Sequence, residues 1–223
     1  MVSVIGDVLP LAVGIAISPI PIIAAILMLL SPKAKGASVG FLLGWIVGIV
    51  VALSVFIALA SVIPQGAADE SQPIAAVLKI VLGALMVLLA IKQWRGRPAR
   101  GEEPALPTWM AAIDHITAVK GIGLGFLLAA VNPKNLLLGA SAGIIIGSAG
   151  LSLTSTVVVV LIFTVIAAVS VAVPVIGYLL AEKAMAGPLE SLRGWLLHNN
   201  AVVMSVLLLV IGVTVVGKGI ASF

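Results

Sequence analysis

The sequence predicts an all-α integral membrane protein with six transmembrane helices, arranged as two inverted three-helix repeats (3+3) in which helices 1 and 4 are broken. Hydrophobic residues make up 62% of the 223 residues and charged residues only 9%. The apolar residues form several runs of about 20 or more, the length that a helix needs to cross a bilayer. Two similar proline motifs also occupy corresponding places in the two halves. A soluble domain of this length could not bury so much apolar sequence.

Six apolar runs define the predicted helices in chain order. They cover residues 8–30, 37–63, 74–91, 121–149, 151–181 and 201–217, with polar loops between them. Asp7 comes directly before the first run and no basic segment precedes it, so this run is predicted to be a retained helix and not a signal peptide.

One long polar segment divides the chain. It reads RGRPARGEEPALPT and is flanked by Trp94 and Trp109, residues typical of a membrane interface. We therefore predict a first repeat over residues 1–94, a cytoplasmic linker over 95–117 and a second repeat over 118–223, together forming one membrane domain. Because three helices are an odd number, the second repeat would cross the membrane in the opposite sense to the first.

The basic residues predict the orientation of the chain. Most of them fall on one side of the six-helix arrangement: Lys33, Lys35, Lys92, Arg95, Arg97, Arg100, Lys120, Lys183 and Arg193. The opposite side has Lys218 together with Asp7, Asp69 and Glu70. The positive-inside rule makes the first side cytoplasmic and puts both termini outside the cytoplasm. These positions explain the basic residues as topology signals, so no nucleic-acid partner is expected.

Two motifs place a polar residue directly before a proline inside an apolar helix. The first is AISPIPIIA and the second is AVNPKNLLL. Pro19 precedes Gly36 by 17 residues and Pro133 precedes Gly150 by the same 17. At about 1.5 Å per residue, each proline lies roughly 20 Å from a cytoplasmic charge, near the middle of the bilayer. Matching breaks at this depth are typical of substrate sites in secondary transporters.

The predicted substrate pathway consists of the residues of these two motifs. They are Ser18, Pro19, Pro21, Asn132, Pro133, Lys134 and Asn135. A proline removes a backbone donor and frees a carbonyl, so the break needs polar groups or a wet cavity around it. The structural alternative is that both motifs are proline kinks with local polar repair.

Lys134 is the most distinctive of these residues. A charge at the centre of the bilayer costs about 2.5–3.5 kcal/mol on insertion scales, and no acid is predicted at that depth to pair with it. Four outcomes stay open: the lysine faces a water-filled cavity, rests on carbonyl oxygens, loses its proton, or holds an anionic lipid head group or a substrate carboxylate.

Glycines form a stripe in each repeat. The predicted helix-packing residues are Gly36, Gly40, Gly44, Gly48, Gly139 and Gly143. Small residues at this spacing let membrane helices approach closely, within one chain or between copies, so a homo-oligomer stays open.

Several chemistries are disfavoured by what the sequence lacks. There are no cysteines, and all eight acids lie near predicted surfaces, so no thiol chemistry and no metal site are expected. The stretch GASAG matches the letters of a serine-hydrolase elbow but lies inside a predicted membrane helix, with His115 and His198 far away at its edge. We therefore expect no enzymatic activity and no cofactor. The sequence contains no nucleotide-binding loop, so it does not indicate which energy source would drive transport.

Three segments carry a family resemblance: ISPIPIIAAILMLLSPKAKGASVGFLLGW, AVNPKNLLLGASAG and WLLHNNAVVMSVLLLVIG. Together they resemble the GAP family of small actinobacterial membrane proteins, also called the sulfolipid-addressing or glycopeptidolipid-addressing family, within the lysine-exporter superfamily. The resemblance implies a multi-pass protein of the bacterial plasma membrane that helps to move glycolipids toward the cell surface. Other members of the superfamily export amino acids or metal ions, or carry thiol redox equivalents.

The predicted function is a secondary transporter or flippase that exports an envelope (glyco)lipid or its precursor by alternating access, with membrane lipids as its partners. Two alternatives remain from the sequence. One is an exporter of amino acids or other small solutes of the lysine-exporter type, and the other is a non-transporting scaffold for envelope-lipid export.

Overall fold

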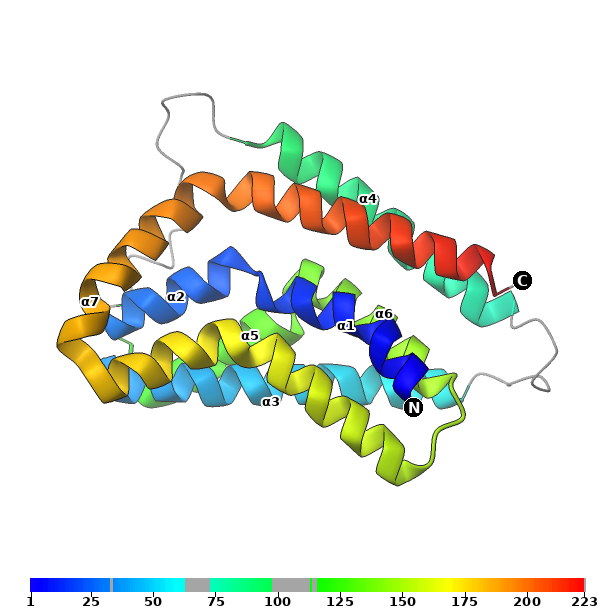
Figure 1. Cartoon of the computed structure of the whole chain (residues 1–223), viewed down its shortest axis with the longest axis horizontal. Helices are drawn as coiled ribbons and strands as arrows, with labels where there is room; N and C mark the ends of the chain where they lie inside the picture. The colour runs from blue at the N-terminus through cyan, green and yellow to red at the C-terminus, as the bar shows by residue number, and fades with distance from the viewer. Residues whose placement is uncertain (33, 63–72, 98–112, 114–115, 223) are drawn as a thin grey trace.

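The computed structural model describes residues 1–32, 34–62, 73–97, 113 and 116–222, and these form an all-helical integral membrane protein (Figure 1). Within these ranges the helices are α1 (Val2–Ala16), α2 (Pro19–Leu29), α3 (Ala34–Ser61), α4 (Pro73–Arg95), α5 (Ala118–Ala130), α6 (Pro133–Gly147) and α7 (Leu153–Ile220). Most of the predicted linker, including residues 98–112, lies outside the described residues.

Both predicted breaks are present. Helices α1 and α2 meet at a bend of 48°, and α5 and α6 meet at a bend of 61°. The second helix of each pair begins at its proline, Pro19 or Pro133. Proline suits the first position of a helix because its fixed φ is helical and its missing N–H would have had no partner there. Each motif therefore ends one helix and starts the next.

Helix α7 differs from the prediction of two helices joined by a polar loop. It runs for 68 residues, with a non-helical residue at Ala181 (φ −145°, ψ 59°) where two helical segments meet across a kink. Figure 1 shows that α7 folds back on itself. Residues 182–198, the predicted loop, are helical. Their polarity indicated a loop, but their Ala, Glu, Lys, Leu and Arg residues are good helix formers. A straight helix of this length would measure about 100 Å, more than three times the hydrocarbon thickness.

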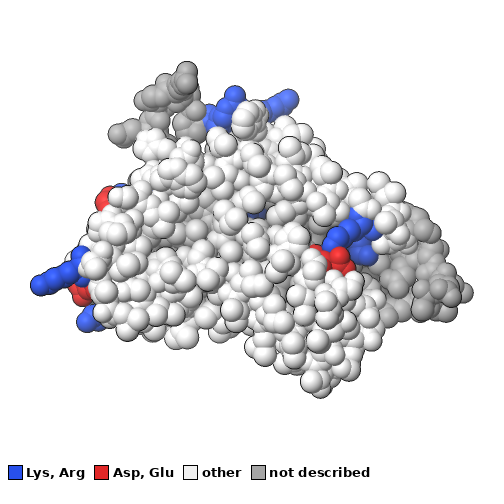
Figure 2. Space-filling view, viewed as in Figure 1, with Lys and Arg blue, Asp and Glu red and all other residues white. Residues whose placement is uncertain are grey.

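Three described helices are each long and apolar enough to cross a membrane, and there are up to five such spans when each bent pair counts as one. The six-span arrangement would require α7 to cross once on each side of Ala181. Both termini lie at the same end of the molecule in Figure 1. Figure 2 shows charged side chains toward the ends and edges of the visible face and an almost uncharged surface between them, which suits a lipid environment.

Helix α3 packs in parallel along α5 and α6 through glycine. A Cβ at Gly40 would approach Ala118, one at Gly48 would lie 2.7 Å from the Cβ of Ala129, and one at Gly143 would meet Phe56. The partners advance together along both chains, so the helices run in the same direction. Gly44 follows the same pattern against Ile122.

Two other predicted packing glycines are less tightly enclosed. A Cβ at Gly36 would lie 3.8 Å from that of Ala118, an ordinary contact, and a Cβ at Gly139 would meet nothing within 4 Å. In addition, α4 and the last part of α7 pack through a glycine pair that sequence reasoning did not identify, Gly83 and Gly212.

The most enclosed element is α2. Nine of its eleven residues are buried, whereas the apolar windows of α3, α4 and α7 are only 28–33% buried and so present most of their surface to lipid. Helices α1 and α2 contact α7 and lie between its two portions in Figure 1. A helix that is apolar on all sides and surrounded by protein belongs to the centre of a bundle. The first break therefore lies inside the protein.

Candidate functional site between the broken helices

The first break leaves carbonyl groups at the end of α1 without hydrogen-bond donors from the helix itself. The Ile17 amide donates to the Val13 carbonyl at 2.9 Å, and Ser18 then adopts an extended conformation. The next residue, Pro19, has no amide hydrogen for the carbonyl four residues before it. The last four carbonyls of a helix have no partner within the helix unless something caps them. The buried end of α1 thus needs donors from elsewhere.

The second break is organised by its own asparagines. The Asn132 side-chain oxygen accepts from the Lys134 amide at 3.1 Å and so caps α6. The Asn135 side chain reaches back across the break and donates from Nδ2 to the Leu128 carbonyl at 2.9 Å. The end of α5 is therefore capped by a residue in the first turn of α6.

Lys134 joins the two breaks. Its Nζ donates to the Gly14 carbonyl at 2.7 Å, across 120 positions of sequence, and the residue is only 6% exposed. Ion pairs in the described residues link Arg193 to Glu190 and Lys218 to Asp7, so no described carboxylate neutralises Lys134. The sequence left four possible environments for Lys134 open, and in this structure the side chain rests on a carbonyl oxygen.

The two accepting carbonyls occupy equivalent positions. Gly14 lies five residues before Pro19, and Leu128 lies five residues before Pro133. Both belong to the last turn of a half-helix, where the helix dipole carries partial negative charge and favours a cation or a donor. Both donors come from the first turn of α6. The first half has Ile20 and Pro21 at the positions corresponding to this pair, and neither side chain can donate, so the site is asymmetric.

The amide ends of α2 and α6 offer few free donors. Pro19 and Pro21 remove two amides from the first turn of α2, and the Ser18 side chain forms no capping hydrogen bond there. In α6 the Leu136 amide donates to the Asn132 carbonyl at 2.8 Å. An anion at this depth would thus depend on the Lys134 side chain more than on backbone amides.

Two buried oxygens on α6 have no hydrogen-bond partner among the described residues. They are Asn135 Oδ1 and Ser141 Oγ, in residues that are 1% and 0% exposed. Ser141 follows Lys134 by seven residues, two helical turns, so both lie on one face of α6. A buried polar atom without a partner costs about 1–3 kcal/mol. These atoms are places where a water molecule or a polar ligand group would be stabilised.

A second polar cluster ties the helices together near the termini. Lys218 Nζ in α7 lies 2.6 Å from Asp7 Oδ1 in α1, and Lys79 Nζ in α4 donates to Ser222 Oγ at 3.1 Å. The sequence placed Lys218 and Asp7 on one side of the membrane but did not single out Lys79. Its position near the start of the third apolar run was the available signal.

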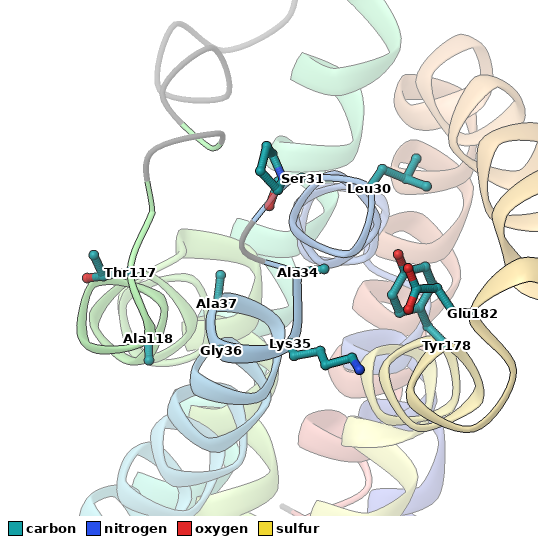
Figure 3. A pocket seen from close by; sticks show the side chains of 11 residues that line it. Leu30, Ser31, Ala34, Lys35, Gly36, Ala37, Thr117, Ala118, Tyr178 and Glu182 are labelled. Atoms are coloured by element: carbon teal, nitrogen blue, oxygen red, sulfur yellow. The ribbon is translucent and has the colours of Figure 1, made fainter.

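A pocket of about 810 Å³ lies at the other end of α2, where α3 and α5 begin and α7 bends (Figure 3). Its lining includes Lys35, Tyr178 and Glu182. None of the residues predicted for the substrate pathway lines this pocket.

A family model described as "Sap, sulfolipid-1-addressing protein" matches residues 8–221. No curated protein matches this chain. No solved structure matches it either.

Proposed function

Since the chain belongs to the sulfolipid-1-addressing protein family, we propose that it exports an envelope lipid or its precursor across the plasma membrane as a secondary transporter or flippase. The family supports a role in addressing envelope lipids. The transport mechanism, the placement in the lysine-exporter superfamily and the orientation with both termini outside the cytoplasm are parts of the proposal.

The hydrogen bond from Lys134 to Gly14 carries this proposal. It fastens the start of α6 to the end of α1 at the depth where both spans are interrupted. A hydrogen bond from a charged group contributes about 1.5–3 kcal/mol, so an anionic group of a substrate could replace the carbonyl at modest cost. Exchange of the lysine between the Gly14 carbonyl and a substrate would release α1 from α6, which is the movement that alternating access requires.

The helix arrangement is compatible with two inverted repeats. Each half contains one broken pair, α1–α2 or α5–α6, in which the second helix starts at proline. Contacts of Gly83 with Gly212 and of Gly219 with Ala76 run in opposite directions along α4 and α7. An antiparallel pair of equivalent helices is what a two-fold axis in the membrane plane would produce.

Replacing Lys134 tests the proposal. Lys134→Met keeps the length and apolar stem of the side chain but cannot donate, Lys134→Gln can donate without charge, and Lys134→Arg keeps the charge. We expect Met to lower lipid export by about tenfold or more, because it removes one hydrogen bond from a charged group. The readout is the amount of lipid extracted from the cell surface of a strain lacking the gene, complemented at equal protein levels. Lys120→Met, at the exposed start of α5, is the control.

The pattern of activities separates the alternatives. Lipid export by Lys134→Arg but not by Lys134→Gln supports binding of an anion at this position. Equal export by Lys134→Gln and the wild type supports a role as a helix cap. Normal surface lipid in Lys134→Met contradicts the transport role of this lysine. A scaffold is tested with purified protein in liposomes that contain a fluorescent head-group-labelled lipid, where only a flippase makes the inner-leaflet dye accessible to dithionite. Intracellular accumulation of an amino acid with normal surface lipids in the deletion strain would favour the amino-acid exporter.

A further inference from the structure

The pocket at the bend of α7 has a composition unlike the other cavities of the described chain discussed here. A cavity of about 420 Å³ between α4 and α7 and another of about 240 Å³ between α3, α4 and α6 are lined mainly by aliphatic and aromatic side chains. The pocket of Figure 3 combines a lysine, a glutamate, a tyrosine and two hydroxyl residues, Ser31 and Thr117. Its lining is that of a polar binding site.

Its charged groups come from different helices and do not neutralise each other. Figure 3 shows the Lys35 side chain extending from α3 toward Tyr178 and Glu182 of α7. Glu182 is exposed, and its carboxylate accepts a hydrogen bond from the hydroxyl of Tyr178, a residue whose side chain is otherwise mostly packed inside the protein. No ion pair joins Lys35 to Glu182, although both are among the described residues. Both side chains line the pocket of about 810 Å³, so a ligand in this space could contact the two together.

The lining selects the chemistry of that ligand. One lysine and one glutamate give the described lining no net charge, and the carboxylate of Glu182 would repel a phosphate or sulfate placed beside it. The same carboxylate accepts hydrogen bonds from hydroxyl groups, and Lys35 donates to their oxygens. A hydroxyl-rich, uncharged group satisfies both residues at once, because each of its hydroxyls can donate and accept.

The size of the pocket favours a large head group. Pockets that hold drug-sized ligands measure about 300–1,000 Å³, and 810 Å³ is near the upper end of this range. A single amino acid would fill only a small part of it. The lining includes Ala34 and Ala118, whose side chains are single methyl groups, and Gly36, which has no side chain, so little side-chain volume fills this part of the pocket. From these observations we infer that this pocket binds a hydroxyl-rich, uncharged sugar head group at the membrane surface.

The pocket and the first break lie at opposite ends of α2. It adjoins Leu30 at the end of α2, and the eleven residues of α2 cover about 17 Å to the first break. Its wall includes residues on both sides of Ala181, the non-helical residue of α7. A ligand bound between Lys35 and Glu182 would thus contact α3 and the bend of α7 together. The inference relies on the proposed function only for the source of the ligand, a lipid.

Cysteine protection tests the inference directly, because the chain has no cysteine of its own. The Ala118→Cys variant places one thiol in the pocket wall, and Val119→Cys places one on the neighbouring residue, which is 77% exposed and is not part of the lining. Each variant is reconstituted in phosphatidylcholine nanodiscs with increasing digalactosyl diacylglycerol. We expect the glycolipid to slow maleimide labelling of A118C in a saturable manner and to leave V119C unchanged.

Second variants identify the contacts. Glu182→Gln and Lys35→Met, each in the A118C background, should raise the half-saturating glycolipid content by about tenfold, the effect of losing one charged hydrogen bond. Glu190→Gln is the matched control, since this glutamate lies on α7 and pairs with Arg193 away from the pocket. Circular dichroism and gel filtration establish that each variant is folded.

Each probe has a defined meaning. Protection by digalactosyl diacylglycerol alone supports a lipid-linked sugar, and equal protection by the free disaccharide supports the same chemistry from a soluble source. Protection by phosphatidylglycerol but not by the glycolipid would overturn the inference, as would no protection by any probe. The protection assay measures binding and does not depend on transport. If K134M exports lipid normally but the glycolipid still protects A118C, the proposed transport role of Lys134 fails and the pocket inference stands.

Discussion

Replacing Gly44 with alanine is expected to destabilise the contact between α3 and α5. A Cβ at this position would lie 2.7 Å from the Ile122 carbonyl carbon and nearer still to its oxygen, whereas an ordinary Cβ contact is 3.4–4 Å. The helices would have to separate by about 0.7 Å or more, because a backbone carbonyl cannot rotate away as a side chain can. Overpacking of this kind costs about 1–3 kcal/mol.

Gly139→Ala is the matched control because its Cβ would meet nothing within 4 Å. Both substitutions are Gly to Ala inside a helix, so the gain in helix propensity, about 1 kcal/mol, is common to the two variants. The difference in the free energy of unfolding, measured by SDS titration in mixed micelles, should therefore be about 1–3 kcal/mol, with Gly44→Ala the less stable. Equal stability of the two variants would refute the argument that close approach through Gly44 positions α5.

Two further predictions concern the second break and the topology. Asn135→Leu should lower the free energy of unfolding by about 1–3 kcal/mol, because the buried Leu128 carbonyl loses its donor; Asn199→Leu, which removes a similar but exposed hydrogen bond to Trp195, should have a smaller effect in the same titration. If the variants are equally stable, the cap on α5 contributes nothing. A phosphatase fused after Phe223 should be active, and a fluorescent protein fused there that folds only in the cytoplasm should be dark. The reverse result would contradict both the orientation and the inverted-repeat proposal.

The Lys134 contact also bears on the choice between a structural and a transporting lysine. In the structure the Lys134 side chain is buried and donates a hydrogen bond to the Gly14 carbonyl, as expected of a residue that caps the end of α1. A cap alone does not account for Asn135 Oδ1 and Ser141 Oγ, which are buried on the same helix without a partner in the described chain. Polar groups beyond those needed for capping favour a site that also receives water or a ligand. These two oxygens support the proposed pathway along α6 alongside the hydrogen bond from Lys134 to Gly14, which carries the proposal.

Sequence reasoning located the broken helices because the signal is local. Proline cannot continue a helix without losing a hydrogen bond, so Pro19 and Pro133 mark the starts of α2 and α6 wherever the rest of the chain lies. The glycine stripe of α3 was readable for a similar reason, since a spacing of four residues repeats one helix face. The helical segment 182–198 was mistaken for a loop because polarity, which reports exposure, was taken as a sign of irregular structure.

By itself, then, the sequence determined that the chain is a bundle of apolar helices, where two of them break, and which residues are able to donate at the second break. Only the tertiary structure decided that Lys134 reaches Gly14, that Gly143 and not Gly139 packs closely, and that Lys35 and Glu182 face one pocket. The reason is physical: helix formation and helix breaking depend on neighbours within a turn or two. A contact between residues 120 positions apart depends on how sharply each broken pair bends, 48° for α1–α2 and 61° for α5–α6, and on how the two pairs then pack together, and no local pattern contains this information.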